Sequence, residues 1–186
     1  MKLSYQGIQD KQGYAAAQVA LPQYDWAKMA EKTAEKPVWV HFGAGNIFRG
    51  FIAGLQQRLL NAGLADSGIV AAETFDYDII DKIYVPHDSM TLMVSLKADG
   101  STQKEVIASI AKGIKANCAD EAQWQQLTDV FTAPSLQMAS FTITEKGYAL
   151  RNMKGELKPE NESDMENGTK QAHHAKAVVA AMLYAR

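Results

Sequence analysis

A glycine-rich stretch that directly follows an apolar run constrains the fold of this chain more than any other feature. Residues 38–42 are VWVHF, and residues 43–51 continue as GAGNIFRGF. An apolar strand that leads into a glycine turn and then a helix is typical of nucleotide-binding α/β proteins. A complete dinucleotide fingerprint has a third glycine, but Phe48 stands at that position. The turn alone therefore leaves two interpretations open, a phosphate-binding turn and a purely structural one.

The residues after the turn predict the beginning of a parallel sheet. A helix is expected over residues 47–61, since apolar residues recur there at helical spacing. They are Ile47, Phe51, Leu55 and Leu59, with Phe48 and Ile52 beside them. A second apolar run at residues 69–72 ends in Glu73, and residues 76–84 can form another helical stretch that stops before Pro86. Strand, turn, helix, strand and helix in this order begin a parallel α/β sheet.

The flanking segments predict further elements. A short helix is expected from Asp25, which can cap it, to the residue before Pro37. Residues 90–96 alternate as in a half-buried strand, and Asp99–Gly100 is a hairpin-turn signal before a possible return strand at 106–110. A helix that begins at Asp120, a β-rich segment at 136–143, a loop at 152–169 and a final helix at 170–186 complete the expected order. The hairpin is expected to lie in or beside the sheet.

Composition excludes several classes of protein. The chain is 47% hydrophobic and 22% charged with a formal net charge of −2, which gives no basic footprint for nucleic acid or for a membrane surface. Nowhere do 18 apolar residues follow one another, so no membrane span is expected, and the cytoplasm is the expected location. Cys118 is the one cysteine, which excludes an intramolecular disulfide and a multi-cysteine zinc site.

The glycine turn suits a pyrophosphate. A helix N-terminus directs unpaired N–H groups and the positive end of its dipole at one spot. Gly43 permits the tight turn, and Gly45 has no side chain to obstruct a phosphate that approaches the backbone. Asn46 is a good N-cap that can also donate to a phosphate oxygen, and Arg49 either adds charge or points to solvent.

An acid at the end of the second strand is the next requirement, because it can hold the adenosine ribose hydroxyls. Glu73 follows Gly43 by 30 residues, against a usual spacing of about 20. The long first helix and its connector account for the excess, and Asp76 is the second candidate. A solvated acid on a loop is the alternative. A carboxylate at this place favours NAD over NADP, since it repels a 2′-phosphate.

Other polar residues carry weaker signals. Tyr24 and Lys28 have the spacing of a dehydrogenase pair but precede the glycine turn, so chance accounts for them better. The adjacent His173 and His174 point about 100° apart on a helix and are expected on a solvated surface. His41, at the end of the first strand, is expected to be a satisfied, partly buried histidine.

Residues 144–148, TEKGY, lie where a sheet strand is expected to end, which is where open α/β sheets bind ligands. Lys146 can meet a phosphate, a substrate carboxylate or Glu145, and a charged turn is the alternative.

Taken together, HFGAGNIFRGF, Glu73 and SFTITEKGY (residues 140–148) resemble the mannitol dehydrogenase family of polyol-type long-chain dehydrogenases. The resemblance covers residues 37 to about 186, and TEKGY is most similar to the fructuronate (mannonate) reductase and mannitol 2-dehydrogenase branches. The opening stretch also looks like mannitol-1-phosphate 5-dehydrogenases, except for Phe48. A Rossmann-like fold is implied: a doubly wound, mostly parallel sheet with an inserted antiparallel hairpin.

The resemblance implies an NAD-linked oxidoreductase of carbohydrate metabolism that interconverts a sugar alcohol or aldonate with its ketose or keto-acid. Residues 1–36 would be an N-terminal extension and residues 37–186 the NAD-binding domain. The expected cofactor-binding residues are Phe42, Gly43, Ala44, Gly45, Asn46, Ile47, Phe48, Arg49, Glu73 and Lys146. No catalytic or metal-binding residue is assigned here, because the family's catalytic lysine belongs to a helical second domain that this chain is expected to lack, as in a truncated protein. The alternative is a stand-alone nucleotide-binding regulatory module without catalysis.

Overall fold

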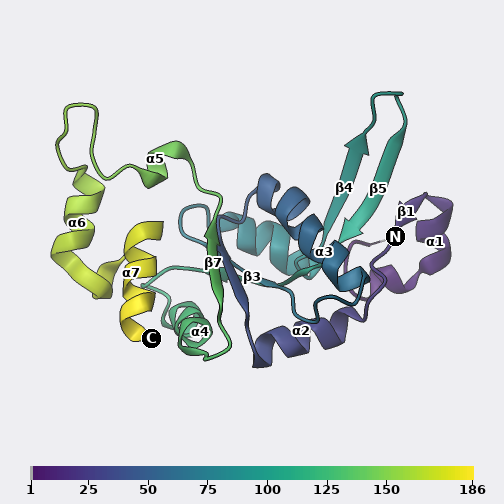
Figure 1. The fold of residues 1–186 in the computed structure, drawn as a ribbon, viewed down its shortest axis with the longest axis horizontal. Helices are drawn as coiled ribbons and strands as arrows, with labels where there is room; N and C mark the ends of the chain where they lie inside the picture. The colour runs from purple at the N-terminus through teal and green to yellow at the C-terminus, as the bar shows by residue number, and fades with distance from the viewer. Residues whose placement is uncertain (1) are drawn as a thin grey trace.

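A computed structural model describes residues 2–186, apart from the side chains of Lys146, Thr169 and Lys170. Its centre is a parallel four-stranded sheet in the order β6-β3-β2-β7 (Figure 1). The strands are β2 (Trp39–Phe42), β3 (Ile69–Glu73), β6 (Ile110–Lys115) and β7 (Met138–Phe141). β2 pairs in parallel with β3 on one side and with β7 on the other. The expected α/β class with a mostly parallel sheet is confirmed.

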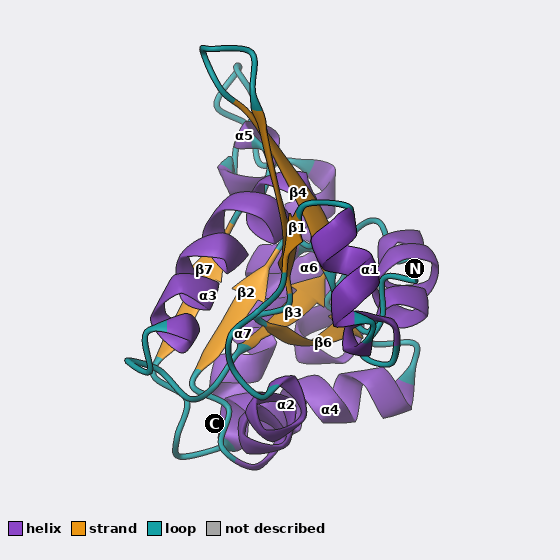
Figure 2. Ribbon diagram, turned by 90° about the vertical axis from the view of Figure 1, so that its right-hand side faces the viewer, coloured by secondary structure: helices purple, strands orange, loops and turns teal. Residues whose placement is uncertain are grey.

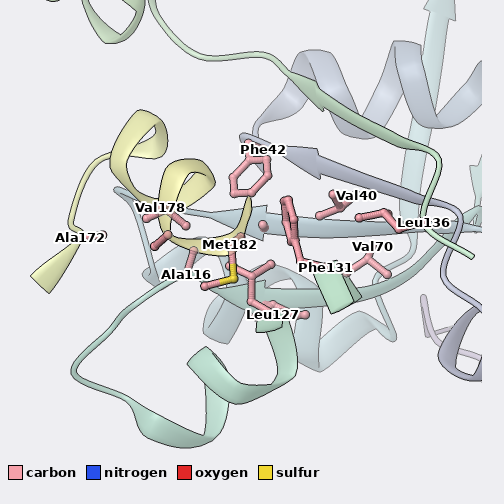
Figure 3. Close-up of a cluster of buried hydrophobic side chains, with 13 residues drawn as sticks. Val40, Phe42, Val70, Ala116, Leu127, Phe131, Leu136, Ala172, Val178 and Met182 are labelled. Atoms are coloured by element: carbon pink, nitrogen blue, oxygen red, sulfur yellow. The ribbon is translucent and has the colours of Figure 1, made fainter. Parts of the chain in front are cut away.

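Each face of the sheet supports its own hydrophobic core, because successive side chains of a strand point to opposite faces. Val40, Phe42 and Val70 face α4 (Glu121–Thr132) and α7 (Ala175–Ala185), which contribute Phe131 and Met182 (Figure 3). On the other face, Ile69, Ala71 and Ile110 pack against the helices that follow the glycine turn and β3. Helices therefore cover both faces, as a doubly wound sheet requires (Figure 2).

Two helix starts follow from local sequence chemistry as predicted. The carboxylate of Asp25 accepts from the Lys28 N–H at 3.1 Å and caps α2 (Trp26–Glu35). Asp120 does the same for α4 through the Gln123 N–H at 3.1 Å. Each acid satisfies a donor that the first turn of a helix leaves without an intrahelical acceptor.

The helix after the glycine turn is irregular, and its apolar stripe is exposed. A π-helical segment, η2 (Phe48–Ile52), continues into α3 (Ala53–Asn61). The residues expected to form its apolar face are largely in solvent: Ile47 is 70% exposed, Phe51 63%, Leu55 43% and Leu59 44%.

Two buried amides on α3 explain this orientation. Gln57 donates to the Val106 carbonyl and accepts from the Ala108 N–H, both at 2.7 Å, while Gln56 donates to the Ser67 carbonyl. These groups satisfy backbone atoms that would otherwise be buried without partners, and they turn the leucines outward.

A hairpin forms a second, small sheet beside the parallel one, as Figure 1 shows. β4 (Thr91–Leu96) pairs antiparallel with β5 (Thr102–Ile107), and β1 (Val19–Ala20) lies along the other edge of β5. Gly100 adopts φ +82° in the turn, in line with the Asp99–Gly100 signal. The expected return strand is present, but its bounds differ from 106–110, because β5 runs from Thr102 to Ile107 and Ile110 begins β6.

The alternation over residues 90–96 does not bury the larger apolar side chains of β4, since Leu92, Val94 and Leu96 are exposed while Met93 packs on the core.

The N-terminal segment packs against this hairpin. η1 (Gly7–Gln9) and α1 (Lys11–Ala16) contribute Ile8 and Tyr14 to a third cluster, which includes Met90 and Val106. The Tyr5 ring stacks on Trp26 with ring centroids 4.9 Å apart. Residues 2–20 thus share a core with the hairpin.

Further helices occur where the sequence pattern is weak. After β3, η3 (Ile80–Tyr84) is π-helical and runs into η4 (Val85–His87), so the helical stretch passes through Pro86 instead of stopping before it. After β7 come α5 (Glu145–Tyr148), α6 (Pro159–Asn167) and η5 (Gly168–Gln171). The loop expected at 152–169 was therefore wrong over α6. The sequence of this helix is polar and has no apolar residues at helical spacing that would predict it. Pro159 at its first turn suits a helix start.

Candidate nucleotide-binding site

A cleft of about 480 Å³ lies at the carboxyl ends of β2, β3 and β7. Open α/β sheets bind ligands at this edge. Three groups of residues line it, from the glycine turn, from the end of β3 and from the segment after β7. They are Gly43, Gly45, Glu73, Thr74, Phe75, Asp76, Ile79, Thr142, Ile143, Thr144, Gly147, Glu160, His174, Ala175 and Lys176.

The two positions of the turn carry glycine for different structural reasons. Gly43 has φ +102°, and a Cβ there would lie 2.4 Å from the Thr142 carbonyl oxygen, so the fold itself requires glycine. A Cβ on Gly45 would meet nothing within 4 Å. Gly45 therefore borders open space in the cleft, where a side chain would obstruct only a ligand.

The start of the helix presents N–H groups at this place. The first intrahelical bond runs from the Arg49 N–H to the Gly45 carbonyl at 3.0 Å. The N–H groups of Asn46, Ile47 and Phe48 precede this bond, so the helix offers them no acceptor. The N-cap role expected of Asn46 was wrong, because Gly45 accepts the first bond and the Asn46 side-chain oxygen instead accepts from the Arg49 guanidinium.

Phe48, at the third glycine position, belongs to the core. It is fully buried and stacks on the His41 ring, with ring centroids 4.0 Å apart and an interplanar angle of 7°. Phe42 and Ala44 are buried as well. These three residues anchor the turn in the hydrophobic core and do not border the cleft.

His41 connects the turn to β7. Its Nδ1 lies 2.7 Å from the Ser140 hydroxyl and its Nε2 lies 2.8 Å from the Thr142 hydroxyl, which in turn donates to the Gly43 carbonyl at 3.3 Å. The Ser140 oxygen also accepts from the indole N–H of Trp39 at 2.7 Å. Burial lowers the pKa of His41 to about 4, so the ring is neutral. The expected satisfied histidine is present, and it is fully rather than partly buried.

Glu73 reaches the turn from the end of β3. One carboxylate oxygen, Oε2, accepts from the Ala44 N–H at 2.8 Å. The other, Oε1, accepts from the N–H groups of Thr74 and Phe75 at 2.9 Å and of Asp76 at 3.4 Å. The acid is 8% exposed and is not the solvated side chain of the alternative interpretation. Because a carboxylate oxygen has two acceptor positions, Oε2 retains one that a ribose hydroxyl can use.

Tyr84 also supports the turn, and no pattern in the sequence singled it out. Its hydroxyl donates to the Ala44 carbonyl at 3.0 Å, and burial raises the pKa of this phenol well above its usual range. Gly113 on β6 leaves room for the ring, since a Cβ there would lie 2.8 Å from it. Only the three-dimensional pairing of β6 with β3 brings these residues together.

The remaining expected residues lie elsewhere. Asn46 and Arg49 line a neighbouring hollow of about 380 Å³ on the hairpin side of the turn, together with His87 and Met93. Ile47 is exposed outside the cleft. Lys146 belongs to α5, but its side chain lies outside the described residues. Asp76 lines the cleft with Glu73.

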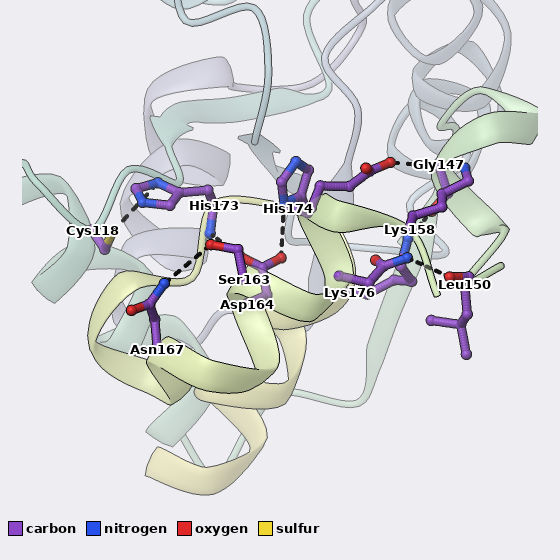
Figure 4. Close-up of polar contacts among 12 residues, drawn as sticks. Cys118, Gly147, Leu150, Lys158, Ser163, Asp164, Asn167, His173, His174 and Lys176 are labelled. Atoms are coloured by element: carbon purple, nitrogen blue, oxygen red, sulfur yellow. Dashed lines mark hydrogen bonds and ion pairs between the residues drawn. The ribbon is translucent and has the colours of Figure 1, made fainter. Parts of the chain in front are cut away.

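A histidine and an acid from the last quarter of the chain also approach the cleft. The Nδ1 atom of His174 lies 2.8 Å from Oδ2 of Asp164 on α6 (Figure 4). Its neighbour His173 is exposed and contacts the Cys118 sulfur at 3.9 Å. His174 is on the surface as expected, with its side chain 42% exposed, but it does not lie on a helix and it lines the cleft. Helical spacing missed it because His174 precedes α7 as its N-cap.

Comparison with known proteins agrees with this geometry. No family model matches the chain. Over all 186 residues, however, it is 41% identical to D-mannonate oxidoreductase of Thermotoga maritima. The chain is similar from end to end to mannitol dehydrogenase-type oxidoreductases. This confirms the resemblance that HFGAGNIFRGF and SFTITEKGY indicated.

Two further proteins are similar to the chain. A solved structure of Pseudomonas fluorescens mannitol 2-dehydrogenase, in ternary complex with NAD and D-mannitol, superposes over 100% of the chain with a TM-score of 0.80 and 25% identity. The polyol:NADP oxidoreductase of Gluconobacter oxydans is 28% identical in an alignment that covers 83% of the chain.

The chain spans about a third of the length of these mannitol dehydrogenase-type relatives: 34% of the Thermotoga protein, 36% of the Pseudomonas chain and 31% of the Gluconobacter protein. In the part of the chain that the structure describes, no helix is long and apolar enough to cross a membrane. The same part holds no group of three or more His, Cys, Asp or Glu side chains placed to bind a metal ion.

Proposed function

We propose that this chain is the NAD(H)-binding part of a cytoplasmic oxidoreductase that interconverts a sugar alcohol or aldonate, such as mannitol or mannonate, with its ketose or keto-acid. The observation that carries the proposal is that Gly45, whose carbonyl accepts the first bond of the helix, and Glu73 line one cleft. The names of the relatives support the reaction class. The nicotinamide, when bound, exchanges a hydride with the carbinol carbon of the substrate.

The residues of the cleft divide the work of binding. Gly45 leaves space for the pyrophosphate, and the N–H groups of Asn46, Ile47 and Phe48 are directed at its oxygens. Glu73 accepts from an adenosine ribose hydroxyl through Oε2 while its other bonds keep the loop after β3 in place. Phe42, Ala44 and Phe48 fix the turn from the core.

The cofactor we assign is NAD, because of the charge on Glu73. A 2′-phosphate on the adenosine ribose would bring two negative charges next to a carboxylate that is already close to the turn. The Gluconobacter relative is named for NADP, so preference within this group of proteins differs from member to member. Arg49 cannot offset this charge from the cleft, since it lines the hollow on the other side of the turn.

Substitution of Gly45 provides the test. Gly45→Val adds a side chain in open space, so the fold should be retained, whereas a bound pyrophosphate would meet the new methyl groups. In calorimetric titration we expect NADH to bind the 186-residue chain weakly. The affinity should fall on the order of tenfold or more in Gly45→Val, equivalent to about 1.4 kcal/mol or more.

Gly43→Ala is the matched control, because it tests the same turn for a structural role. A Cβ at this position meets the Thr142 carbonyl at 2.4 Å and φ is +102°, so the free energy of unfolding should fall by about 2–4 kcal/mol. The proposal fails if NADH does not bind the unmodified chain, or if Gly45→Val binds it with unchanged affinity.

A further inference from the structure

We propose that His174, held by Asp164, contacts the ribose on the nicotinamide side of the bound dinucleotide. This inference rests on the proposed function and assigns one more residue to the same cleft. It begins from the geometry of the pair: the carboxylate of Asp164 lies 2.8 Å from Nδ1 of His174 and accepts the His173 backbone N–H at 3.3 Å (Figure 4).

Asp164 is buried while His174 remains accessible, as a ligand contact by His174 requires. The Asp164 side chain is 7% exposed, while that of His174 is 42% exposed. A carboxylate only accepts hydrogen bonds, so Nδ1 of His174 carries the proton. In the neutral ring Nε2 is then an acceptor, and Asp164 fixes its direction. A hydroxyl is the group that such an acceptor recognises.

The order of the strands decides which half of the dinucleotide lies near His174. β2, which leads into the glycine turn, lies between β3 and β7. Glu73 at the end of β3 is on the adenosine side, with the pyrophosphate over the turn. The other half of the molecule therefore extends toward the residues after β7, where Thr142, Thr144 and His174 line the cleft.

The position of His174 is secured from both neighbouring helices. Asp164 projects from α6, and the Lys176 ammonium on α7 donates to the Gly147 carbonyl of α5 at 2.5 Å. These bonds join the segment that carries His174 to the segment that follows β7. The imidazole consequently has a fixed place relative to Thr144 and Gly147.

Binding of three nucleotides tests the inference in the 186-residue chain. ADP ends at the pyrophosphate, ADP-ribose adds the second ribose, and NADH adds the nicotinamide. His174→Ala should weaken binding of ADP-ribose and NADH about tenfold, the loss expected for one hydrogen bond, and leave ADP binding unchanged. His173→Ala is the matched control, since the adjacent ring contacts Cys118, and it should leave all three affinities unchanged.

Asp164→Asn tests the positioning role. Its amide oxygen can still accept from Nδ1–H, but the amide lacks the carboxylate charge and holds the ring less firmly, so ADP-ribose affinity should fall, though by less than in His174→Ala. In the His174→Ala background the same change should have no further effect, because the two residues act as one unit. A merely structural role would lower all three affinities in both backgrounds. Should Asp164→Asn not fold, the His174 and His173 variants decide the question.

The outcomes separate the two proposals. Unchanged ADP-ribose and NADH affinity in His174→Ala, or an equal loss of ADP affinity, would overturn the role of His174 and leave the proposed function standing. If the unmodified chain bound none of the three nucleotides, the proposed function would be overturned, and this inference with it.

Discussion

Gly43 and Gly45 are the same letter two positions apart, yet the structure needs them for different reasons. Gly43 is required by the backbone conformation of the turn, because its φ of +102° is a value that L-residues rarely adopt. Gly45 leaves empty space beside the cleft. A sequence motif cannot separate these roles, because the neighbour that forbids a Cβ at Gly43 is Thr142, which directly follows β7 and is far away in the sequence.

His41 should make the stability of the protein depend on pH. Its pKa is about 4 in the folded state against an ordinary value of 6.5, so the unfolded chain binds the proton more readily. The stabilising contribution is therefore complete above pH 6.5 and is lost as pH falls toward 4. The free energy of unfolding should drop by about 3 kcal/mol across this window through His41 alone, measured by urea denaturation at several pH values.

Carboxylates also titrate near the lower end of this window, so a variant without the imidazole is the control. His41→Gln keeps polar atoms near Ser140 and Thr142 but does not titrate. Its stability should depend less steeply on pH than that of the unmodified protein between pH 6.5 and 4. Equal slopes in the two proteins would show that His41 is not the buried neutral group described here.

Sequence reasoning placed Glu73 near the turn, but it could not find the bonds that the acid makes. The apolar run that ends in Glu73 predicts a strand with an acid at its carboxyl end, and β3 confirms the strand. The bond from the Ala44 N–H to Glu73 joins residues 29 positions apart and depends on the register of β2 with β3. Tyr84 escaped prediction for the same reason, since its partner Ala44 is 40 positions away, whereas His174 escaped because it precedes α7 as its N-cap.

At the scale of elements, the helix after the turn shows how local periodicity can indicate a helix and still misplace its buried face. Phe48 is fully buried on His41, and Phe51, three residues later, is 63% exposed. The spacing of apolar residues predicts the helix, because any repeat near 3.6 residues is compatible with one. Its orientation depends on Gln56 and Gln57, which satisfy backbone groups of the neighbouring strands and connectors.

The two phenylalanines supply a direct test of this orientation. Phe48→Ala should cost about 3–5 kcal/mol of unfolding free energy, as for other buried aromatic residues, and Phe51→Ala should change it by no more than about 0.5 kcal/mol. Chemical denaturation of both variants measures the difference. If Phe51→Ala proved as destabilising as Phe48→Ala, the described exposure of the stripe would be incorrect.

Two elements that the sequence pattern did not predict, β6 and α6, are stabilised by contacts with other segments of the fold. β6 contains Lys112 and Gly113, which interrupt its apolar run, and Gly113 is there to admit the Tyr84 ring. α6 has a polar sequence, but its buried Asn161 and Asp164 bond to the Leu150 carbonyl and to His174. Local propensity predicts neither element, since tertiary contacts stabilise both.

At the scale of the whole molecule, the parallel sheet places its functional residues at one edge although they come from distant segments. Gly45, Glu73 and His174 meet at one cleft because parallel strands all end on the same side. The molecule has other hollows, among them one of about 600 Å³ between the N-terminal segment and α2. The start of α2 lines it through Asp25 and Trp26, but the Asp25 carboxylate already accepts from the Lys28 N–H there and would repel a phosphate, so we assign no nucleotide to it.

The most direct test of the account is to map where NADH binds by following the backbone amide resonances of isotopically labelled protein during a titration. We expect the largest shifts at the backbone N–H groups of Gly45–Phe48, where the helix begins, and at Thr74–Asp76 and Thr142–Gly147 beside the cleft. Residues around the hollow near Tyr5 and Trp26 should not respond. Shifts confined to that hollow, or no shifts at all, would contradict the assignment of the cleft as the dinucleotide site.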